Sequence, residues 1–327
     1  MHHWRWLWLS TLSLLLYAAA PARAQGEPDG PVQRNRGARD SARGPRGKAA
    51  PALRVEKVTA SCYATVRAGG LSNAGFVVGR DSVLVIDCLD SADRARELFQ
   101  AIAKVTDKPV RTVVHTHAHY DHTVGNQAMP KDVAIIASRA ATDWLAKRLK
   151  KDRLLLGPSG GGIHMSLGIA GVRNPTRPIT VPTELDLGGL KVRLLVAGDC
   201  HSAGDLVVYV ASERVLFAGD LVWSGCHPNI ASGSTFRWIG ALAQIERLDI
   251  EKVVPGHGAP GVKELLRSQR HYLMNLRRLV KHLARKQMDP KKIVQGLEIP
   301  EPYREFAHAA WWPKNVGYVH QELMKNR

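Results

Sequence analysis

The chain has 327 residues, and its 46 lysines and arginines against 29 acidic residues give a formal net charge of +17. Hydrophobic residues make up 45% and charged residues 23%, which is typical of a globular protein and excludes wholesale disorder or a disulfide-dense miniprotein. The net charge is +6 over residues 1–54, +3 over 55–260 and +8 over 261–327. Because the excess charge lies at the two ends, we expect no nucleic acid partner.

The first 24 residues have the pattern of a secretory signal peptide. Arg5 precedes an apolar run from Leu7 to Ala20, which is shorter than the roughly 20 residues that a membrane span needs. A small-x-small cleavage pattern ends at Ala24. We therefore expect cleavage after Ala24, a periplasmic or secreted protein, and no stable membrane anchor after cleavage. Residues 25–52 are rich in Gly, Pro and Arg, which predicts a disordered basic linker.

Short β-rich runs then alternate with helical patterns, which predicts a layered α/β domain over residues 53–260. The predicted strands are residues 75–79, 82–87, 111–114, 133–137, 192–196, 206–210, 215–218 and 252–254. The predicted helices are one capped by Ser91 and running to about Val105, and residues 140–151, 236–248 and 262–286. Residues 157–190 are rich in Gly and Pro and are expected to form an irregular loop or flap. Residues 261–327 are expected to form a helical extension packed on the same domain.

The sequence HTHAHYDH, from His115 to His122, follows one of the predicted strands directly. His117 and His119 are two residues apart, so their imidazoles can point the same way. Asp121 and its neighbour His122 add a carboxylate and a third imidazole. Four such groups within six residues predict a bound cation, and these donors suit zinc, iron or manganese.

Three later segments place a further ligand-type residue beside a glycine at the end of a predicted strand. These residues are His201, Asp220 and His257. The ordered pattern HxHxDH, His, Asp, His resembles that of the metallo-β-lactamase superfamily, over about residues 55–260. The resemblance implies an α/β fold, an αβ/βα sandwich of two mixed sheets flanked by helices, with metals bound at one edge.

The resemblance further implies two metal ions, expected to be Zn²⁺ with iron or manganese as alternatives. The implied ligands are His117, His119 and His201 for the first ion, Asp121, His122 and His257 for the second, and Asp220 bridging both. A hydroxide activated between the ions would attack an ester, thioester, lactone or lactam carbonyl of a small-molecule substrate. Asp121 would act as a catalytic proton shuttle as well as a ligand.

Several activities remain open within this resemblance. A bridging Asp220 resembles glyoxalase II and related thioesterase-like or lactonase-like hydrolases. The segment 201–217 also resembles zinc β-lactamases, but those enzymes place a cysteine where Asp220 stands and a lysine where Trp223 stands. Residues 219–223 resemble exported hydrolases associated with sulfur oxidation or quinoprotein systems. A mononuclear-iron persulfide dioxygenase is the remaining alternative.

Other residues have both a structural and a functional interpretation. Asp87, at the end of its strand, is expected either to orient a ligand histidine or to form hydrogen bonds at the edge of the core. His115 is expected to pack or to support the site. The tryptophans Trp223, Trp311 and Trp312 either wall the site or pack in the core. The disulfide pairing of Cys62, Cys88, Cys200 and Cys226 and the oligomeric state stay open.

Overall fold

The computed structural model describes residues 53–156 and 168–325, which belong to one unit of the chain, Ala52–Arg327. The predicted signal peptide, the predicted linker 25–52 and residues 157–167 of the predicted loop lie outside the described residues. Among the helices in the described ranges, none combines the length and the apolar character needed to cross a membrane.

Within residues 53–156 and 168–325, thirteen strands form two mixed sheets. The first sheet contains, in spatial order, β1 (Arg54–Lys57), β2 (Cys62–Val66), β3 (Gly75–Val78), β4 (Val83–Ile86), β5 (Val110–Val114), β6 (Ala134–Ser138) and β7 (Arg177–Ile179). Strands β1 to β4 pair antiparallel, and β5, β6 and β7 continue parallel to β4. The carboxyl ends of β4, β5 and β6 therefore meet at one edge of this sheet.

The second sheet has six strands. Its spatial order is β13 (Gly261–Val262), β12 (Lys252–His257), β11 (Val215–Trp223), β10 (Asp205–Val210), β9 (Lys191–Gly198) and β8 (Thr183–Asp186). Only β11 and β12 pair in parallel, and the other neighbours are antiparallel. β11 and β12 therefore deliver their carboxyl ends to the same edge.

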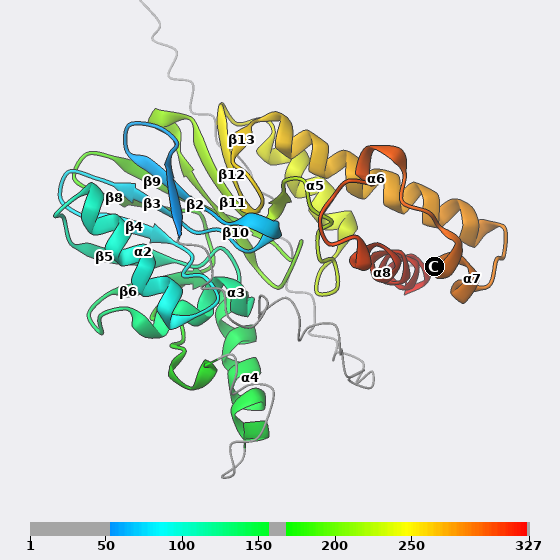
Figure 1. The fold of residues 1–327 in the computed structure, drawn as a ribbon, viewed down its shortest axis with the longest axis horizontal. Coiled ribbons are helices and arrows are strands. Elements are labelled where there is room, and N and C mark those ends of the chain that lie inside the picture. Colours follow the sequence, from blue (N-terminus) through cyan, green and yellow to red (C-terminus); the bar gives the residue numbers. More distant parts are fainter. Residues whose placement is uncertain (1–52, 157–167, 326–327) are drawn as a thin grey trace, which may run out of the picture. The chain divides into compact units, whose positions relative to one another are not determined.

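Helices flank the two sheets (Figure 1). The α-helices are α2 (Ala92–Val105), α3 (Tyr120–Thr123), α4 (Arg139–Leu156), α5 (Thr235–Ile245), α6 (Glu264–Arg285), α7 (Pro290–Gly296) and α8 (Trp312–Lys325). Short 3₁₀ turns are η1 (Ala68–Gly70), η2 (Val124–Ala128), η4 (Ile169–Gly171), η5 (Ala211–Glu213), η6 (Glu301–Tyr303) and η7 (Ala309–Trp311). Ser91 caps α2 as predicted, because its hydroxyl accepts a hydrogen bond from the Arg94 amide at 3.2 Å.

The main core lies between the sheets, where side chains such as Ile86, Leu194 and Phe217 interdigitate. A second cluster packs α2 against the outer face of the first sheet. A third packs α5, α6 and α8 against the outer face of the second sheet. This arrangement is the sandwich of two mixed sheets with flanking helices that the sequence predicted.

The prediction of an irregular segment over 157–190 is wrong for part of that range. β7 and β8 lie within it, each at the edge of a sheet. They are short, and the exposure of β8 alternates residue by residue between intermediate and exposed. Edge strands of this kind bury little apolar surface, so they lack the hydrophobic run by which the central strands were predicted.

Candidate metal centre

The first sheet contributes four of the predicted ligands from one short stretch. The end of β5 is buried, and the amide of His115 still donates to Ile136 O of β6 at 2.8 Å before the chain leaves the sheet. His117 follows in the turn, and His119 lies immediately before α3. α3 itself carries Asp121 and His122.

The second sheet contributes three residues from separate places, which are the turn after β9, the interior of β11 and the end of β12. His201 lies in the turn between β9 and β10, and Asp205 fixes this turn by accepting from the Cys200 and Ser202 amides at 3.1 and 2.9 Å. Burial raises the pKa of Asp205 to about 6. Asp220 lies in β11 and His257 is the last residue of β12.

The strand next to Asp220, β12, must have no side chain at the position that faces the Asp220 carboxylate. A Cβ atom placed on Gly256 of β12 would lie 2.0 Å from Asp220 Oδ1. Glycine at this position therefore leaves the space in which the Asp220 carboxylate stands, where any larger residue would displace it.

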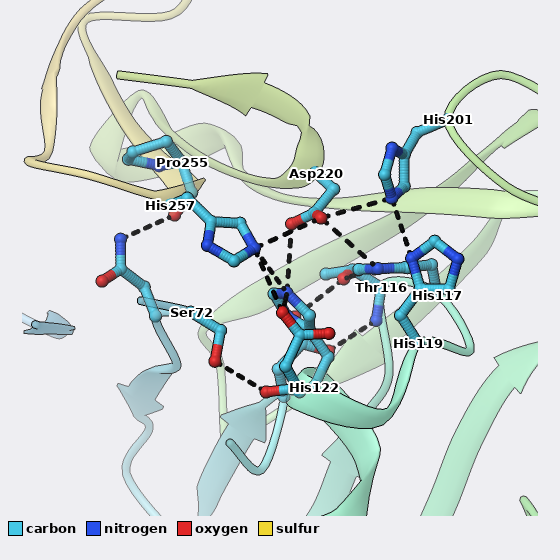
Figure 2. Close-up of polar contacts among 12 residues, drawn as sticks. Ser72, Thr116, His117, His119, His122, His201, Asp220, Pro255 and His257 are labelled. Atoms are coloured by element: carbon cyan, nitrogen blue, oxygen red, sulfur yellow. Dashed lines mark hydrogen bonds and ion pairs between the residues drawn. The ribbon is translucent and has the colours of Figure 1, made fainter. Parts of the chain in front are cut away.

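The predicted ligands gather at one edge of the sandwich, where four of the histidines contact Asp220 (Figure 2). Asp220 Oδ2 lies 3.7 Å from His117 Nε2, 3.2 Å from His201 Nε2 and 3.3 Å from His257 Nε2. Asp220 Oδ1 lies 3.1 Å from His122 Nε2. The carboxylate therefore stands between histidines contributed by both sheets.

Three groups of potential ligand atoms lie at this centre, and one of them consists of Asp87, His117 and His122. Of the other two, which we call the two ligand groups, the first comprises His117, His119, His201 and Asp220, and the second comprises Asp121, His122 and His257. In the first, His119 Nδ1 and His201 Nε2 are 2.9 Å apart. In the second, Asp121 Oδ2 lies 3.3 Å from His257 Nε2, which is 3.4 Å from His122 Nε2. These two ligand groups agree with the division that the sequence resemblance implied, and the role of these residues as ligands stays a prediction.

Asp87 orients two of the histidines. Its Oδ2 accepts from His122 Nδ1 at 2.9 Å and from the Thr116 hydroxyl at 2.7 Å. Because the Thr116 hydroxyl donates its proton to Asp87, it accepts from His117 Nδ1 at 3.0 Å. Each ring thus carries a proton on Nδ1, and its Nε2 faces the centre bare when the ring is neutral. The orienting role predicted for Asp87 is confirmed by these contacts.

His257 is oriented by a backbone carbonyl. Its Nδ1 donates to Gly70 O at 2.8 Å, which leaves Nε2 facing Asp121 and Asp220. The tautomer that exposes a bare Nε2 is the one that binds a metal ion.

The protonation of the centre depends on its carboxylates. Burial, together with the nearby His201, lowers the pKa of His119 to about 3. Burial acts in the same direction on His257, but Asp220 and Asp121 outweigh it and raise the pKa of His257 to about 9. The pKa of His122 is likewise raised well above its ordinary value against the effect of burial. Protons on these rings would balance the negative charge of the carboxylates, and a bound cation would replace those protons.

A divalent metal ion fits this donor set. Among the described residues, the buried atoms His117 Nε2 and Asp220 Oδ1 have no hydrogen-bond partner. Ligand atoms held 2.0–2.1 Å from a tetrahedral zinc ion stand about 3.3 Å apart, close to the separations found here. The Asp121 side chain is 42% exposed, whereas those of His117, His122, His201, Asp220 and His257 are at most 5% exposed. The centre is therefore open to solvent on the side of Asp121.

Aromatic rings line both ends of the centre. The Trp223 ring stacks on His257 with centroids 3.7 Å apart, and Trp311 contacts Trp223 at 5.5 Å. Trp144 of α4 meets the His119 ring edge-on at 5.8 Å. Trp312 is instead buried among the helices of the extension. Trp223 and Trp311 therefore border the site, and Trp312 belongs to the core.

The loop between β2 and β3 is a part of the site that no sequence pattern indicated. The Ser72 hydroxyl donates to Asp121 O at 2.7 Å. The Asn73 side-chain amide donates to Pro255 O at 3.0 Å and to Gly258 O at 2.7 Å, on either side of His257. These short polar residues carry no motif, so only the folded chain reveals their position.

All four cysteines are buried free thiols, so none of them forms a disulfide in the structure. Burial raises the pKa of Cys226 to about 11 and is the largest cause that raises the pKa of Cys62 to about 12. Cys200 and Cys226 pack in the core of the second sheet, as expected for small buried residues.

The model of the metallo-β-lactamase superfamily matches residues 67–257, which is more than half of the chain. A linear primary-alkylsulfatase from a Pseudomonas species is 23% identical over 257 residues, covering 67% of this chain and 48% of the relative. A type 2 metallo-β-lactamase from a Bacillus species is 28% identical over 198 residues, covering 59% and 69%. The solved structure of a metallo-β-lactamase from Pontibacter korlensis has a TM-score of 0.57 and 22% identity, and covers 68% of this chain and 99% of that one.

The chain belongs to the metallo-β-lactamase superfamily. Its relatives carry the names of hydrolases, so the predicted enzyme class is confirmed at that level. The chain spans about half the length of the first curated relatives that it matches.

Proposed function

We propose that this protein is an exported dinuclear metal-dependent hydrolase that cleaves an ester, thioester, lactone or lactam. The observation that carries the proposal is the position of Asp220, whose two carboxylate oxygens face both groups of ligand atoms. A carboxylate in that position can be shared by two cations. The expected export rests on the signal-peptide pattern of residues 1–24.

The chain's own residues divide into holding and proton-handling roles. In this proposal Asp220 binds both ions, and the remaining ligands are His117, His119, His201, Asp121, His122 and His257. Bound divalent ions supply Lewis-acid polarisation of the scissile bond and a water that ionises near neutral pH. Asp121 alone among the carboxylates of the centre is substantially exposed, so it can pass a proton between the reacting groups and solvent.

The surroundings of Asp220 favour an acyl or ester substrate over a β-lactam drug. Trp223, at the position of the expected lysine, is 5% exposed and stacks on His257. Its indole Nε1 donates to Asp220 O at 3.0 Å. This side chain therefore offers a flat apolar ring and no ammonium group with which to hold a drug carboxylate.

Sulfate-ester hydrolysis is a second candidate. It is supported by the alkylsulfatase relative, whose match spans 257 residues and covers 67% of this chain. The half-buried ring of Trp144, beside His119, suits the apolar chain of an alkyl ester.

The test is elemental analysis of the purified protein, followed by turnover of nitrocefin, S-lactoylglutathione, lactones, p-nitrophenyl esters and a linear alkyl sulfate. We expect two metal ions per chain, and turnover of at least one substrate that chelation abolishes. Two bound zinc ions with no turnover of any of these would refute the hydrolase proposal. A single iron per chain would instead favour persulfide oxidation. Recovery of the processed protein from a periplasmic or culture fraction tests export.

A further inference from the structure

The C-terminal extension reaches the candidate metal centre through a short segment, residues 306–311, which we call the strap. The Ala307 amide donates to Gly225 O at 2.9 Å, and Ala307 O accepts from the His227 amide at 2.9 Å. These two bonds form a parallel bridge beside Cys226, just beyond the end of β11. The strap is therefore fixed next to the strand that carries Asp220.

His308 of the strap shares a hydrogen-bond acceptor with His257. His308 Nε2 donates to Gly70 O at 3.1 Å, and His257 Nδ1 donates to the same oxygen at 2.8 Å. The approach is close, because a Cβ atom on Gly70 would lie 2.5 Å from His308 Nε2 and 2.8 Å from Cys226 Sγ. Gly70 also has φ +70°, so both its conformation and its surroundings require glycine.

A series of ring contacts, two stacked and one edge-on, also joins the same two histidines. The His308 ring stacks on Trp311 at 5.0 Å with an interplanar angle of 19°. Trp311 meets Trp223 at 5.5 Å, and Trp223 stacks on His257 at 3.7 Å and 7°. His257 and His308 are thus connected twice, once through Gly70 O and once through the rings of Trp311 and Trp223.

The backbone of His308 is held in a conformation that residues with a side chain avoid. Its φ of +63° and ψ of +34° are left-handed. Such a conformation costs free energy and persists where the surrounding contacts determine it. Here those contacts are the ones that place the imidazole against Gly70 O and Trp311.

We propose that His308 is a positioning residue for the metal site, because it fixes Gly70 O and, through that oxygen, the orientation of His257. The hydrogen bond to Gly70 O keeps a proton on His257 Nδ1, and the Trp223 face prevents the ring from turning. His257 Nε2 is thereby held toward Asp121 and Asp220. This inference rests on the proposed function, in which His257 is a metal ligand.

The test compares zinc binding by the full chain and its His308→Asn variant. Asparagine tolerates the left-handed conformation but is too short to reach Gly70 O, so the backbone is spared and the hydrogen bond is lost. Zinc affinities are measured by competition with a chromophoric chelator, starting from metal-free protein. We expect one of two zinc affinities to fall about tenfold, with the other unchanged, as for the loss of a partner behind a metal ligand.

Two further variants make the result specific. His308→Gln, which restores an N–H donor of similar reach, should recover the affinity. His320→Asn changes a histidine of the same extension that lies in α8 and should leave both affinities unchanged. If metal-free His308→Asn melts below the parent, the zinc affinities of all variants are measured at a temperature at which each metal-free protein is fully folded.

The outcomes separate this inference from the proposed function. Wild-type protein that binds fewer than two zinc ions would contradict the dinuclear proposal itself. Wild-type protein that binds two, together with a folded His308→Asn variant whose two affinities are within threefold of the parent, would overturn only the role of His308.

Discussion

The two sheets build one site in different ways. The first supplies four predicted ligands within six residues, from His117 to His122, in a single turn after β5. The second supplies His201 from the turn before β10, Asp220 from the interior of β11 and His257 from the end of β12. The compact contribution depends on local geometry, whereas the dispersed one depends on the packing and register of the sheet. Changes on the second sheet should therefore affect the site through the fold as well as through chemistry.

The largest effect is expected for Asp220→Ala, which removes the carboxylate that both ligand groups contact. Turnover should fall by about three orders of magnitude or more, because both ions lose a ligand. Metal content and kcat/KM are the measurements. Asp107→Ala, an exposed aspartate between α2 and β5, is the matched control. A variant that keeps two ions and full turnover would remove Asp220 from the site.

The packing between the sheets is tested by Phe217→Ala. Phe217 is 2% exposed and lies in the core that both sheets share. The free energy of unfolding should fall by about 3–5 kcal/mol, as for other buried phenylalanines. Urea unfolding of the metal-free protein measures it. A loss below 1 kcal/mol would show that the sheets are held together mainly by other contacts.

A smaller effect, on zinc affinity, is expected for the two buried carboxylates that support the site, and its size should differ between them. Asp87→Asn in the first sheet weakens contacts with Thr116 and the Nδ1 proton of His122, and should lower zinc affinity about 10–100-fold. Asp205→Asn in the second sheet changes only the turn that carries His201 and should lower it less. Chelator competition gives both values, and the reverse order would contradict the comparison.

The smallest effect concerns the cysteines of the two sheets. Because the thiolate is the reactive form, a pKa of about 11 for Cys226 and about 12 for Cys62 makes both slow to alkylate at pH 7. The rate should rise about tenfold per pH unit up to those values, with Cys226 ahead of Cys62 by about tenfold. Peptide mass mapping after iodoacetamide treatment measures the order, and the unfolded chain is the control. Equal rates in the folded protein would show that opening of the fold, and not ionisation, controls access.

The contrast between the sheets also explains what the sequence could predict. His117 to His122 form a local pattern, and the later His, Asp and His follow in a fixed order, so all seven positions were predicted before the fold was known. The strands β3 to β6 and β9 to β12 were predicted from apolar runs, whereas the interior strand β2 was not. β7 and β8 were missed because these short edge strands contain few apolar residues, so neither has a hydrophobic run.

The contacts behind the ligands could not be predicted in the same way. Ser72 and Asn73 carry no motif, and they reach Asp121 and the end of β12 only when distant parts of the chain meet. Gly70 O and His308 Nε2 are separated by 238 positions in sequence. Asp87 is the exception. Its position at the end of a strand beside the predicted site already suggested that its carboxylate orients a ligand histidine.

The three hydrogen bonds of Asn73 have a consequence for how the site is assembled. Its backbone amide donates to Gly256 O at 2.7 Å, and its side chain binds the carbonyls of Pro255 and Gly258, some 182 positions along the chain. Such distant contacts form late in folding because a long loop must close first. We therefore expect His257 to join the other ligands only after the β2–β3 loop has packed against the end of β12. Metal uptake during refolding would then report the completion of folding, because the site lacks its last ligand until the whole domain has formed.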